Sequence, residues 1–273
     1  MIAPQWWQYD VFALWQRNRR NRCYFGMLNQ PKEAIRGFGR LIRLALLPHI
    51  EEPAWPGLQV PETGGSKIVD FHDIENYFEE LVHHHDYVRE ALLAMVRQSH
   101  LGCTDIDFQN SIMVNVRLGD FTAPAVNCPP GTGSYNQRTA IEWYIAAVQE
   151  LRDNFGAEWP AYIVSDGTDD ELRALMRLEN THRLKVEDLA GLLTLSRAHV
   201  LVASGSTYSM WASFLGQMPV LWPPGQRRQS LYPKCPMAEP EWSPGAQLSA
   251  GFLEAVAHHS PCGPEFVGSS PVR

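Results

Sequence analysis

Short apolar runs alternate with amphipathic stretches through the second half of the chain. The runs are SIMVNV, AYIVS, HVLVAS and PVLW, and the stretches among them are RTAIEWYIAAVQELRDNF, TDDELRALMRL, VEDLAGLLTLS and TYSMWASFLG. The runs have the length and composition of buried strands, whereas the longer stretches repeat apolar residues at helical spacing. Strands that alternate with helices form parallel sheets covered on both faces. The pattern therefore predicts a doubly wound α/β fold from position 111 onward.

The first half of the chain has a less regular pattern. CYFGMLNQ predicts a short strand, 23–28, that runs into a turn, and PKEAIRGFGRLIRLALL predicts a helix. KIVDF predicts another strand after the Pro- and Gly-rich loop 53–65, and one or two helices are expected over 74–98. We assign 1–108 to an amino-terminal domain, 109–247 to a carboxyl-terminal domain, and 248–273 to a helix with a mobile tail.

Composition and charge narrow the classes of function. The formal net charge of the 273-residue chain is −7, which argues against a general nucleic-acid binder because such proteins carry a basic footprint. The cysteines are far apart and form no CxxC pair, as is typical of reduced thiols in a cytosolic protein. No apolar run reaches the ~18 residues of a membrane span, and MIAPQWWQYD lacks the order of a signal peptide. We therefore expect a cytoplasmic protein without a membrane span.

Three charged motifs have a plain structural interpretation. QRNRRNR predicts the solvated basic face of a helix, with peripheral contact to acidic lipid or to an acceptor as the alternative. In HHHD, 83–86, consecutive side chains on a helix point about 100° apart and cannot converge on one metal ion. In DID, 105–107, the carboxylates precede a strand, so a loop is favoured over a manganese site. The basic residues of the first motif are Arg17, Arg19, Arg20 and Arg22.

Polar residues follow three of the predicted strands at the point where each strand ends. In open parallel sheets, ligands bind beyond the carboxyl ends of the strands, so these three clusters should meet at one edge. They are Arg117, Gly119 and Asp120 after SIMVNV; Ser165, Asp166 and Gly167 after AYIV; and Ser204, Gly205, Ser206 and Thr207 after HVLVA.

The chemistry of these clusters suits a nucleotide diphosphate. SGST, 204–207, offers hydroxyls, a glycine and the N–H groups of a helix start to phosphate, and Arg117 offers a planar guanidinium fork. The carboxylate of Asp166 can accept two N–H donors of guanine. Each cluster also has a structural alternative. Arg117 can pair with Asp120, and SDG and SGST can cap the helices that follow them.

Three segments resemble the GDP-fucose-dependent fucosyltransferases that share a His-x-Arg-Arg-x-Asp motif, the α1,2-fucosyltransferases above all. In chain order they are VNVRLGDF, YIVSDG and DLAGLLTLSRAHVLVASGSTYSMWASFLG. GMLNQ is similar to the Gly-x-x-Asn-Gln turn of that family. The likeness spans residues 24–222 and is most specific in SGSTYSMW. Asn115 and Leu118 stand where the family has its histidine and its second arginine, so the chain resembles a divergent member.

The resemblance implies a GT-B type glycosyltransferase, with parallel sheets in two Rossmann-like domains that face each other across a cleft. The donor would lie mainly on the second domain, and Asn29 and Gln30 would cover it from the first, acceptor-side domain. Arg117 would bind the β-phosphate of the donor, and Asp166 would bind its guanine. The other candidates for donor contact are Asn115, Ser165, Ser204, Gly205, Ser206 and Thr207, of which the last two would bind the diphosphate.

The activity that the resemblance implies is an inverting transfer of fucose from GDP-fucose to a hydroxyl of a glycan acceptor, without metal or cofactor. Arg117 and the helix dipole behind Ser206 would stabilise the negative charge that grows on the departing β-phosphate. Asp120 is the candidate base, with a pairing to Arg117 as its alternative. Two other functions stay open, namely transfer from a different nucleotide sugar and non-catalytic binding of a nucleotide or sugar.

Overall fold

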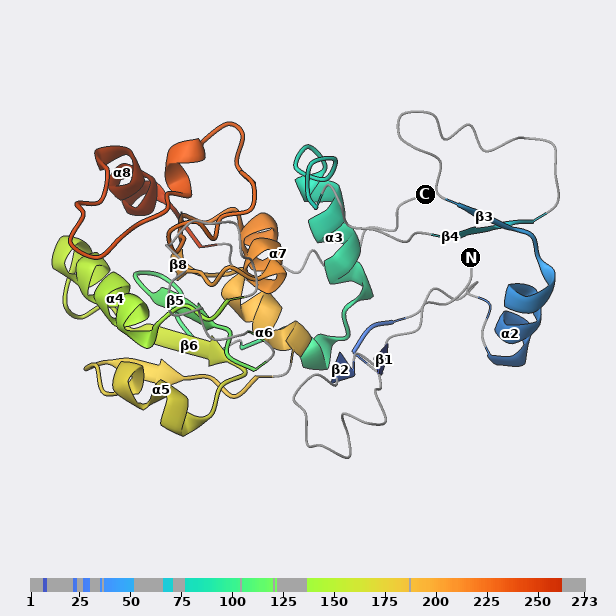
Figure 1. Ribbon diagram of the computed structural model, residues 1–273, viewed down its shortest axis with the longest axis horizontal. Coiled ribbons are helices and arrows are strands. Elements are labelled where there is room, and N and C mark those ends of the chain that lie inside the picture. Colours follow the sequence, from blue (N-terminus) through green and yellow to red (C-terminus); the bar gives the residue numbers. More distant parts are fainter. Residues whose placement is uncertain are drawn as a thin grey trace.

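A five-stranded parallel sheet forms the centre of the second half of the chain (Figure 1). Its strands are β5 (Ile112–Val116), β6 (Ala161–Ser165), β7 (Thr181–Arg183), β8 (Val200–Val202) and β9 (Val220–Leu221). Their spatial order is β7-β6-β5-β8-β9, and every neighbouring pair is parallel. The structure is a computed structural model that describes residues 7–8, 22–23, 27–29, 35, 37–51, 66–70, 77–103, 105–119, 121, 137–186 and 188–261.

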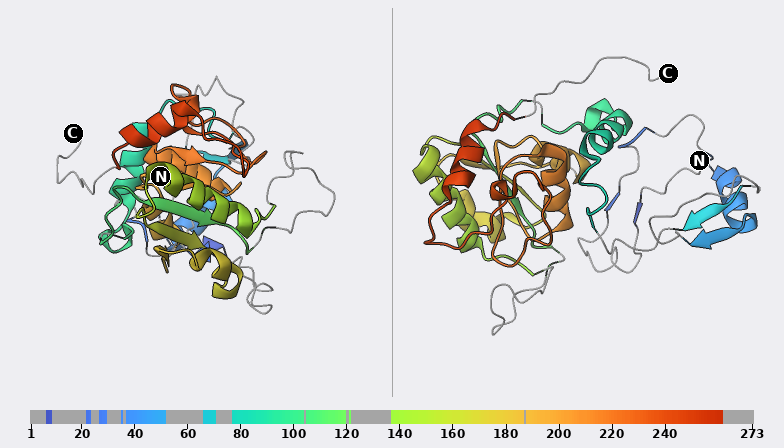
Figure 2. Two further views of the ribbon diagram at one scale, coloured as in Figure 1. Left: turned by 90° about the vertical axis from the view of Figure 1, so that its left-hand side faces the viewer. Right: turned by 90° about the horizontal axis from the view of Figure 1, so that it is seen from above.

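Helices cover both faces of this sheet. One face packs against α4 (Ile141–Phe155), α5 (Asp169–Met176) and α8 (Ala250–His258), and the other against α6 (Asp188–Leu195) and α7 (Thr207–Gly216) (Figures 1 and 2). Side chains of β5 alternate between the two layers, since Ile112 and Val114 join the core of the first face whereas Met113 joins that of the second. The predicted α/β fold with a parallel sheet is confirmed.

The predicted apolar runs correspond to β5, β6, β8 and β9, and the strand β7 was missed. Its residues, THR, are half-buried or exposed because β7 lies at the edge of the sheet. An edge strand with exposed side chains carries no apolar run, so the hydrophobic pattern could not reveal it.

The direction of sheet growth reverses between β5 and β8. The chain lays down β5, β6 and β7 towards one side and then returns, so that β8 and β9 lie on the other side of β5. In doubly wound sheets the crevice outside the carboxyl ends of the two strands at such a reversal is the usual ligand position. Here those carboxyl ends lead into Arg117 and the SGST segment, 204–207.

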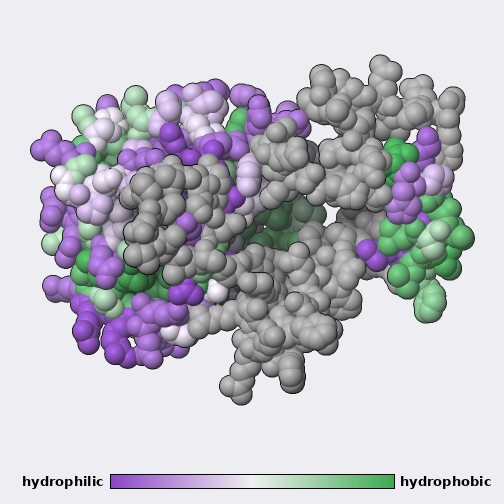
Figure 3. All heavy atoms as spheres, in the orientation of Figure 1, coloured by the Kyte–Doolittle hydropathy of each residue, from purple (hydrophilic) through white to green (hydrophobic). Residues whose placement is uncertain are grey.

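The described part of the first half holds two small sheets. β1 (Trp7–Gln8) pairs antiparallel with β2 (Arg22–Cys23), and β3 (His49–Glu51) pairs parallel with β4 (Ile68–Asp70). The helix α2 (Gly37–Leu46) precedes β3, and its exposed apolar side chains form the green surface at the right edge of Figure 3. A second Rossmann-like domain and the two-domain GT-B arrangement therefore stay predictions.

The helix α3 (His85–Met95) connects the first half of the chain to the sheet domain. The ring of Phe78, before this helix, lies 4.7 Å from that of Trp211 and 5.1 Å from that of Phe214, centroid to centroid, so it packs on α7. Met27 and Leu28 pack in turn against α3 and α6. Among the described residues there are also two short 3-10 helices, Gln98–His100 and Pro236–Ala238. None of the helices in the described residues is both long and apolar enough to span a membrane.

Candidate functional site

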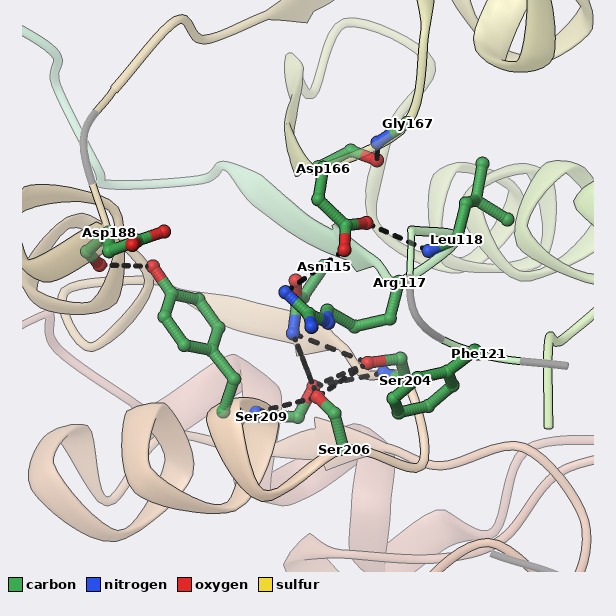
Figure 4. A network of polar contacts seen from close by, with 12 residues as sticks. Asn115, Arg117, Leu118, Phe121, Asp166, Gly167, Asp188, Ser204, Ser206 and Ser209 are labelled. Carbon is green, nitrogen blue, oxygen red and sulfur yellow. Dashed lines mark hydrogen bonds and ion pairs between the residues drawn. The ribbon is translucent and has the colours of Figure 1, made fainter. Parts of the chain in front are cut away.

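A buried polar network joins β5 to the SGST segment (Figure 4). The side-chain amide of Asn115, only 1% exposed, donates to the hydroxyl oxygens of Ser209 at 2.7 Å, Ser204 at 3.3 Å and Ser206 at 3.5 Å. The hydroxyls of Ser204 and Ser206 lie 2.9 Å apart, and the backbone N–H of Ser204 donates to the oxygen of Ser209. Asn115 thus holds the carboxyl end of β8 and the start of α7 against β5.

The serine hydroxyls shape the SGST segment from within. The oxygen of Ser206 accepts the backbone N–H of Ser209, which makes Ser206 the N-cap of α7 and confirms that SGST caps the following helix. Ser204 and Ser206 are 2% and 3% exposed, so their hydroxyls face the interior of the network. Thr207, the first residue of α7, is half-buried and is the remaining hydroxyl of the segment.

Arg117 and Asp166 are brought together at the ends of neighbouring strands. Nη1 of Arg117 lies 3.1 Å from Oδ2 of Asp166, and Oδ1 of Asp166 accepts the backbone N–H of Leu118 at 2.8 Å. The guanidinium also lies over the ring of Phe121, 5.6 Å from its centroid. Both oxygens of the carboxylate therefore help to fix the chain where β5 ends, as Figure 4 shows.

Asp166 is not the cap of the following helix. The N-cap of α5 is Thr168, whose hydroxyl accepts the N–H of Glu171 while the carboxylate of Glu171 accepts the N–H of Thr168. The interpretation that SDG caps this helix is therefore wrong. The SDG turn is instead stabilised by its own atoms, since the hydroxyl of Ser165 accepts the N–H of Gly167 at 2.9 Å.

The strand β7 contributes a second contact to this turn. Arg183, at its carboxyl end, donates through Nη2 to the carbonyl oxygens of Gly167 at 2.6 Å and Ser165 at 3.3 Å. Nη1 of the same guanidinium forms an ion pair with Asp169. Because β7 has no apolar run, the sequence pattern gave no sign that Arg183 would help to hold Asp166 in place.

A third arginine, Arg228, reaches the SGST segment from the loop after β9. Its Nη2 donates to the carbonyl oxygen of Gly205 at 3.2 Å, and its Nη1 donates to the hydroxyl of Tyr77 at 2.6 Å. The pair RR after the last strand was visible in the sequence, but the loop that carries it is Pro-rich and without a motif. Only the strand order places this loop beside the end of β8.

The other residues singled out from the sequence divide into three groups. Asn29 is exposed, and its backbone N–H donates to the carbonyl of Met95, so it lies beside the end of α3. Leu118 is 4% exposed and packs where a side chain on Gly167 would fall, 2.6 Å from its Cδ1. Gln30, Asp120, Arg17, Arg19 and Arg20 lie outside the described residues, as does the tail beyond 261.

A histidine-lined pocket lies near the amino end of β9, whereas the polar network lies at the carboxyl ends of the strands. Its volume is about 740 Å³, and its lining includes Gln217 and Pro219, which precede β9. The motif HHHD and the end of α8 contribute five histidines to the lining, namely His83, His84, His85, His258 and His259. Within the described residues, no group of three or more His, Cys, Asp or Glu side chains is placed to hold a metal ion.

Burial determines the protonation of two groups near these features. Burial raises the pKa of Tyr144 above its ordinary value, and the charge of Asp166 adds to this shift, so the phenol stays protonated at neutral pH. Burial also lowers the pKa of His259 to about 4, with the neighbouring charge of His199 as a further cause. Both side chains are therefore neutral at pH 7.

The arrangement is a set of polar side chains at the reversal of strand order. Arg117 supplies a charged group directly after β5, and α7 begins directly after β8. Comparison with known proteins found no match, either among protein-family models or among curated protein sequences.

Proposed function

We propose that the chain is an inverting glycosyltransferase that takes fucose from GDP-fucose and needs no metal ion. The observation that carries the proposal is the position of Arg117 and of the SGST segment, 204–207, on either side of the strand reversal between β5 and β8. A phosphate group in the crevice outside these strands would meet a guanidinium from one side and a helix N-terminus from the other. Both groups favour negative charge.

The electrostatic role of this site would be to stabilise the leaving diphosphate. As the glycosidic bond breaks, negative charge develops on the β-phosphate, and a fixed donor lowers the barrier because it needs no reorganisation. Arg117 is held by Asp166 and is 11% exposed, so its guanidinium keeps one orientation. Loss of one such donor typically costs about 3 to 4 kcal/mol in the barrier.

The geometry refines the roles of Asp166 and the serines. Both carboxylate oxygens of Asp166 are engaged, with Arg117 and with the N–H of Leu118. Each carboxylate oxygen has a further lone pair that could accept an N–H of guanine, but we propose orientation of Arg117 as the first role of Asp166 because that contact is present in the structure. Since Ser204 and Ser206 face inward, Thr207 and the backbone N–H groups at the start of α7 are the proposed diphosphate contacts.

Calorimetric titration with GDP in the presence of a chelator tests the donor assignment. We expect the wild-type chain to bind GDP without divalent metal and to bind UDP and ADP at least tenfold more weakly. Equal affinity for the three nucleotides would favour a transferase of another nucleotide sugar. Binding that appears only with manganese or magnesium would contradict the proposed site. The second step is to measure release of GDP from GDP-fucose with a panel of glycan acceptors.

A non-catalytic binding module is the second candidate, and the surroundings of Arg117 favour it over other classes. Leu118 is a buried core residue, and the amide of Asn115 is engaged with three serines. The segment after β5 therefore offers one basic side chain, Arg117, where the resembled family has two arginines. GDP binding without any turnover of GDP-fucose across the acceptor panel would select this function.

A further inference from the structure

The guanidinium of Arg228 lies against the SGST segment. It follows β9, which is the neighbour of β8 in the sheet, and it contacts the carbonyl oxygen of Gly205. Arg117 follows β5, the neighbour of β8 on the other side. The two arginines therefore follow the two strands that flank β8, which leads into the loop that begins α7.

Tyr77 fixes the position of Arg228. Its hydroxyl accepts Nη1 at 2.6 Å, and its ring centroid lies 5.3 Å from the guanidinium carbon. The φ angle of Tyr77 is 44°, a value that aromatic residues rarely adopt and that persists only where the surroundings enforce it. The next residue, Phe78, is held by contacts with distant segments, since its N–H donates to Oε1 of Gln229 at 3.1 Å and its ring packs against Trp211.

Gly205 allows the loop after β9 to approach the SGST segment closely. A Cβ atom at this position would overlap Oε1 of Gln226 and lie 3.0 Å from its Cβ. A side chain there would displace the amide of Gln226 and crowd its Cβ, so glycine lets this loop pack closely against the start of α7. The glycine at position 205 therefore leaves room for the loop that brings Arg228 to the SGST segment.

We propose that Arg228 is a second phosphate-binding residue for the nucleotide donor, and that Tyr77 is a positioning residue that holds it. This inference rests on the proposed function. A diphosphate outside β5 and β8 would lie between two guanidinium groups, which stay charged at physiological pH and bind phosphate oxygens in pairs. Because Tyr77 comes from the segment before α3, donor binding would depend on how that segment packs on the sheet domain.

Titration of Arg228→Gln with GDP and with guanosine, under a chelator, tests the proposal. We expect the affinity for GDP to fall at least tenfold, which corresponds to about 1.4 kcal/mol. The affinity for guanosine should stay within about twofold of wild type, since guanosine carries no phosphate and the charge-assisted contact is lost only for phosphate. Tyr77→Phe, which removes only the hydroxyl, should weaken GDP binding about threefold to fivefold.

Arg227→Gln is the matched control. Arg227 is adjacent in sequence, but its Nη1 donates to the carbonyl of Glu239 and its N–H to the carboxylate of Glu241, so this variant should bind GDP as wild type does. A folded Arg228→Gln variant with wild-type GDP affinity would overturn this inference and leave the proposed function standing. A wild-type chain that fails to bind GDP would overturn both. If Arg228→Gln melts early, Tyr77→Phe decides, and unchanged GDP affinity in that variant also overturns the inference.

Discussion

Arg117 and Asp166 directly follow the neighbouring strands β5 and β6 and form an ion pair in which Nη1 lies 3.1 Å from Oδ2. The side chains are 11% and 23% exposed, so the pair is partly shielded from water. The second carboxylate oxygen accepts the N–H of Leu118, which ties the pair to the backbone just beyond β5. This arrangement explains how an always-charged guanidinium can stand where a buried strand runs out.

Asp166→Asn should weaken the binding of GDP and of ADP by the same factor, about tenfold. The amide can still accept the N–H of Leu118 but no longer balances the charge of Arg117, so the guanidinium loses its orientation for either nucleotide. Titration of both nucleotides measures the effect. A loss confined to GDP would show instead that Asp166 contacts guanine. Thr168→Ala, which removes the cap of α5 and costs about 1 kcal/mol in stability, should leave both affinities unchanged.

Arg117→Lys should fold but bind GDP more than tenfold more weakly than wild type. Lysine keeps the positive charge but cannot offer two parallel N–H donors to a phosphate or a carboxylate. Thermal melting and GDP titration separate stability from binding. A variant that melts much earlier and still binds GDP normally would identify Arg117 as a purely structural partner of Asp166.

Asn115→Leu should lower the free energy of unfolding by about 1 to 3 kcal/mol, because it removes the donor shared by three buried hydroxyls. The measurement is urea denaturation at neutral pH. Asn154→Leu is the control, since Asn154 is an exposed residue of α4 and its replacement should change stability by less than about 0.5 kcal/mol. Equal stabilities of the two variants would mean that the serines find other partners.

Sequence reasoning succeeded where the hydrophobic pattern was regular. The apolar runs located β5, β6, β8 and β9, and the rule that parallel strands share a carboxyl edge anticipated that Arg117 would lie near Asp166. What a residue does within a cluster depends on distances that no linear pattern contains. The pattern could not show that the two charges pair with each other or that the serine hydroxyls face inward.

The features that were missed depend on contacts between distant segments. β7 is a polar edge strand, so no apolar period marks it. Arg228 and Tyr77 are 151 positions apart, and neither stands in a recognisable motif. Their meeting depends on the packing of α3 on α7 and on the position of β9 beside β8, which are properties of the folded chain.

A last prediction concerns pH and the pair His199 and His259, whose ring centroids lie 5.9 Å apart near the end of α8. Nε2 of His199 lies 2.9 Å from the carbonyl oxygen of Val256, and its Nδ1 lies 3.1 Å from the backbone nitrogen of Asn110, so the neutral ring satisfies both groups. Burial lowers the pKa of His199 and brings that of His259 to about 4. In the unfolded chain both rings take up a proton near pH 6.5.

The two neutral rings contribute to the stability of the folded chain, and their folded pKa values lie below the unfolded ones. This contribution is therefore fully present above about pH 6.5 and is lost as the pH falls towards about 4. Each group lowers the free energy of unfolding by at most about 1.4 kcal/mol per pH unit in that window. Urea denaturation between pH 7.5 and about 4.5 should show that the free energy of unfolding falls more steeply with pH for wild type than for His259→Gln, because glutamine at position 259 cannot take up a proton. His182→Gln, at an exposed position of β7, should follow wild type. Parallel curves for wild type and His259→Gln would mean that His259 titrates in the folded chain as it does in the unfolded one.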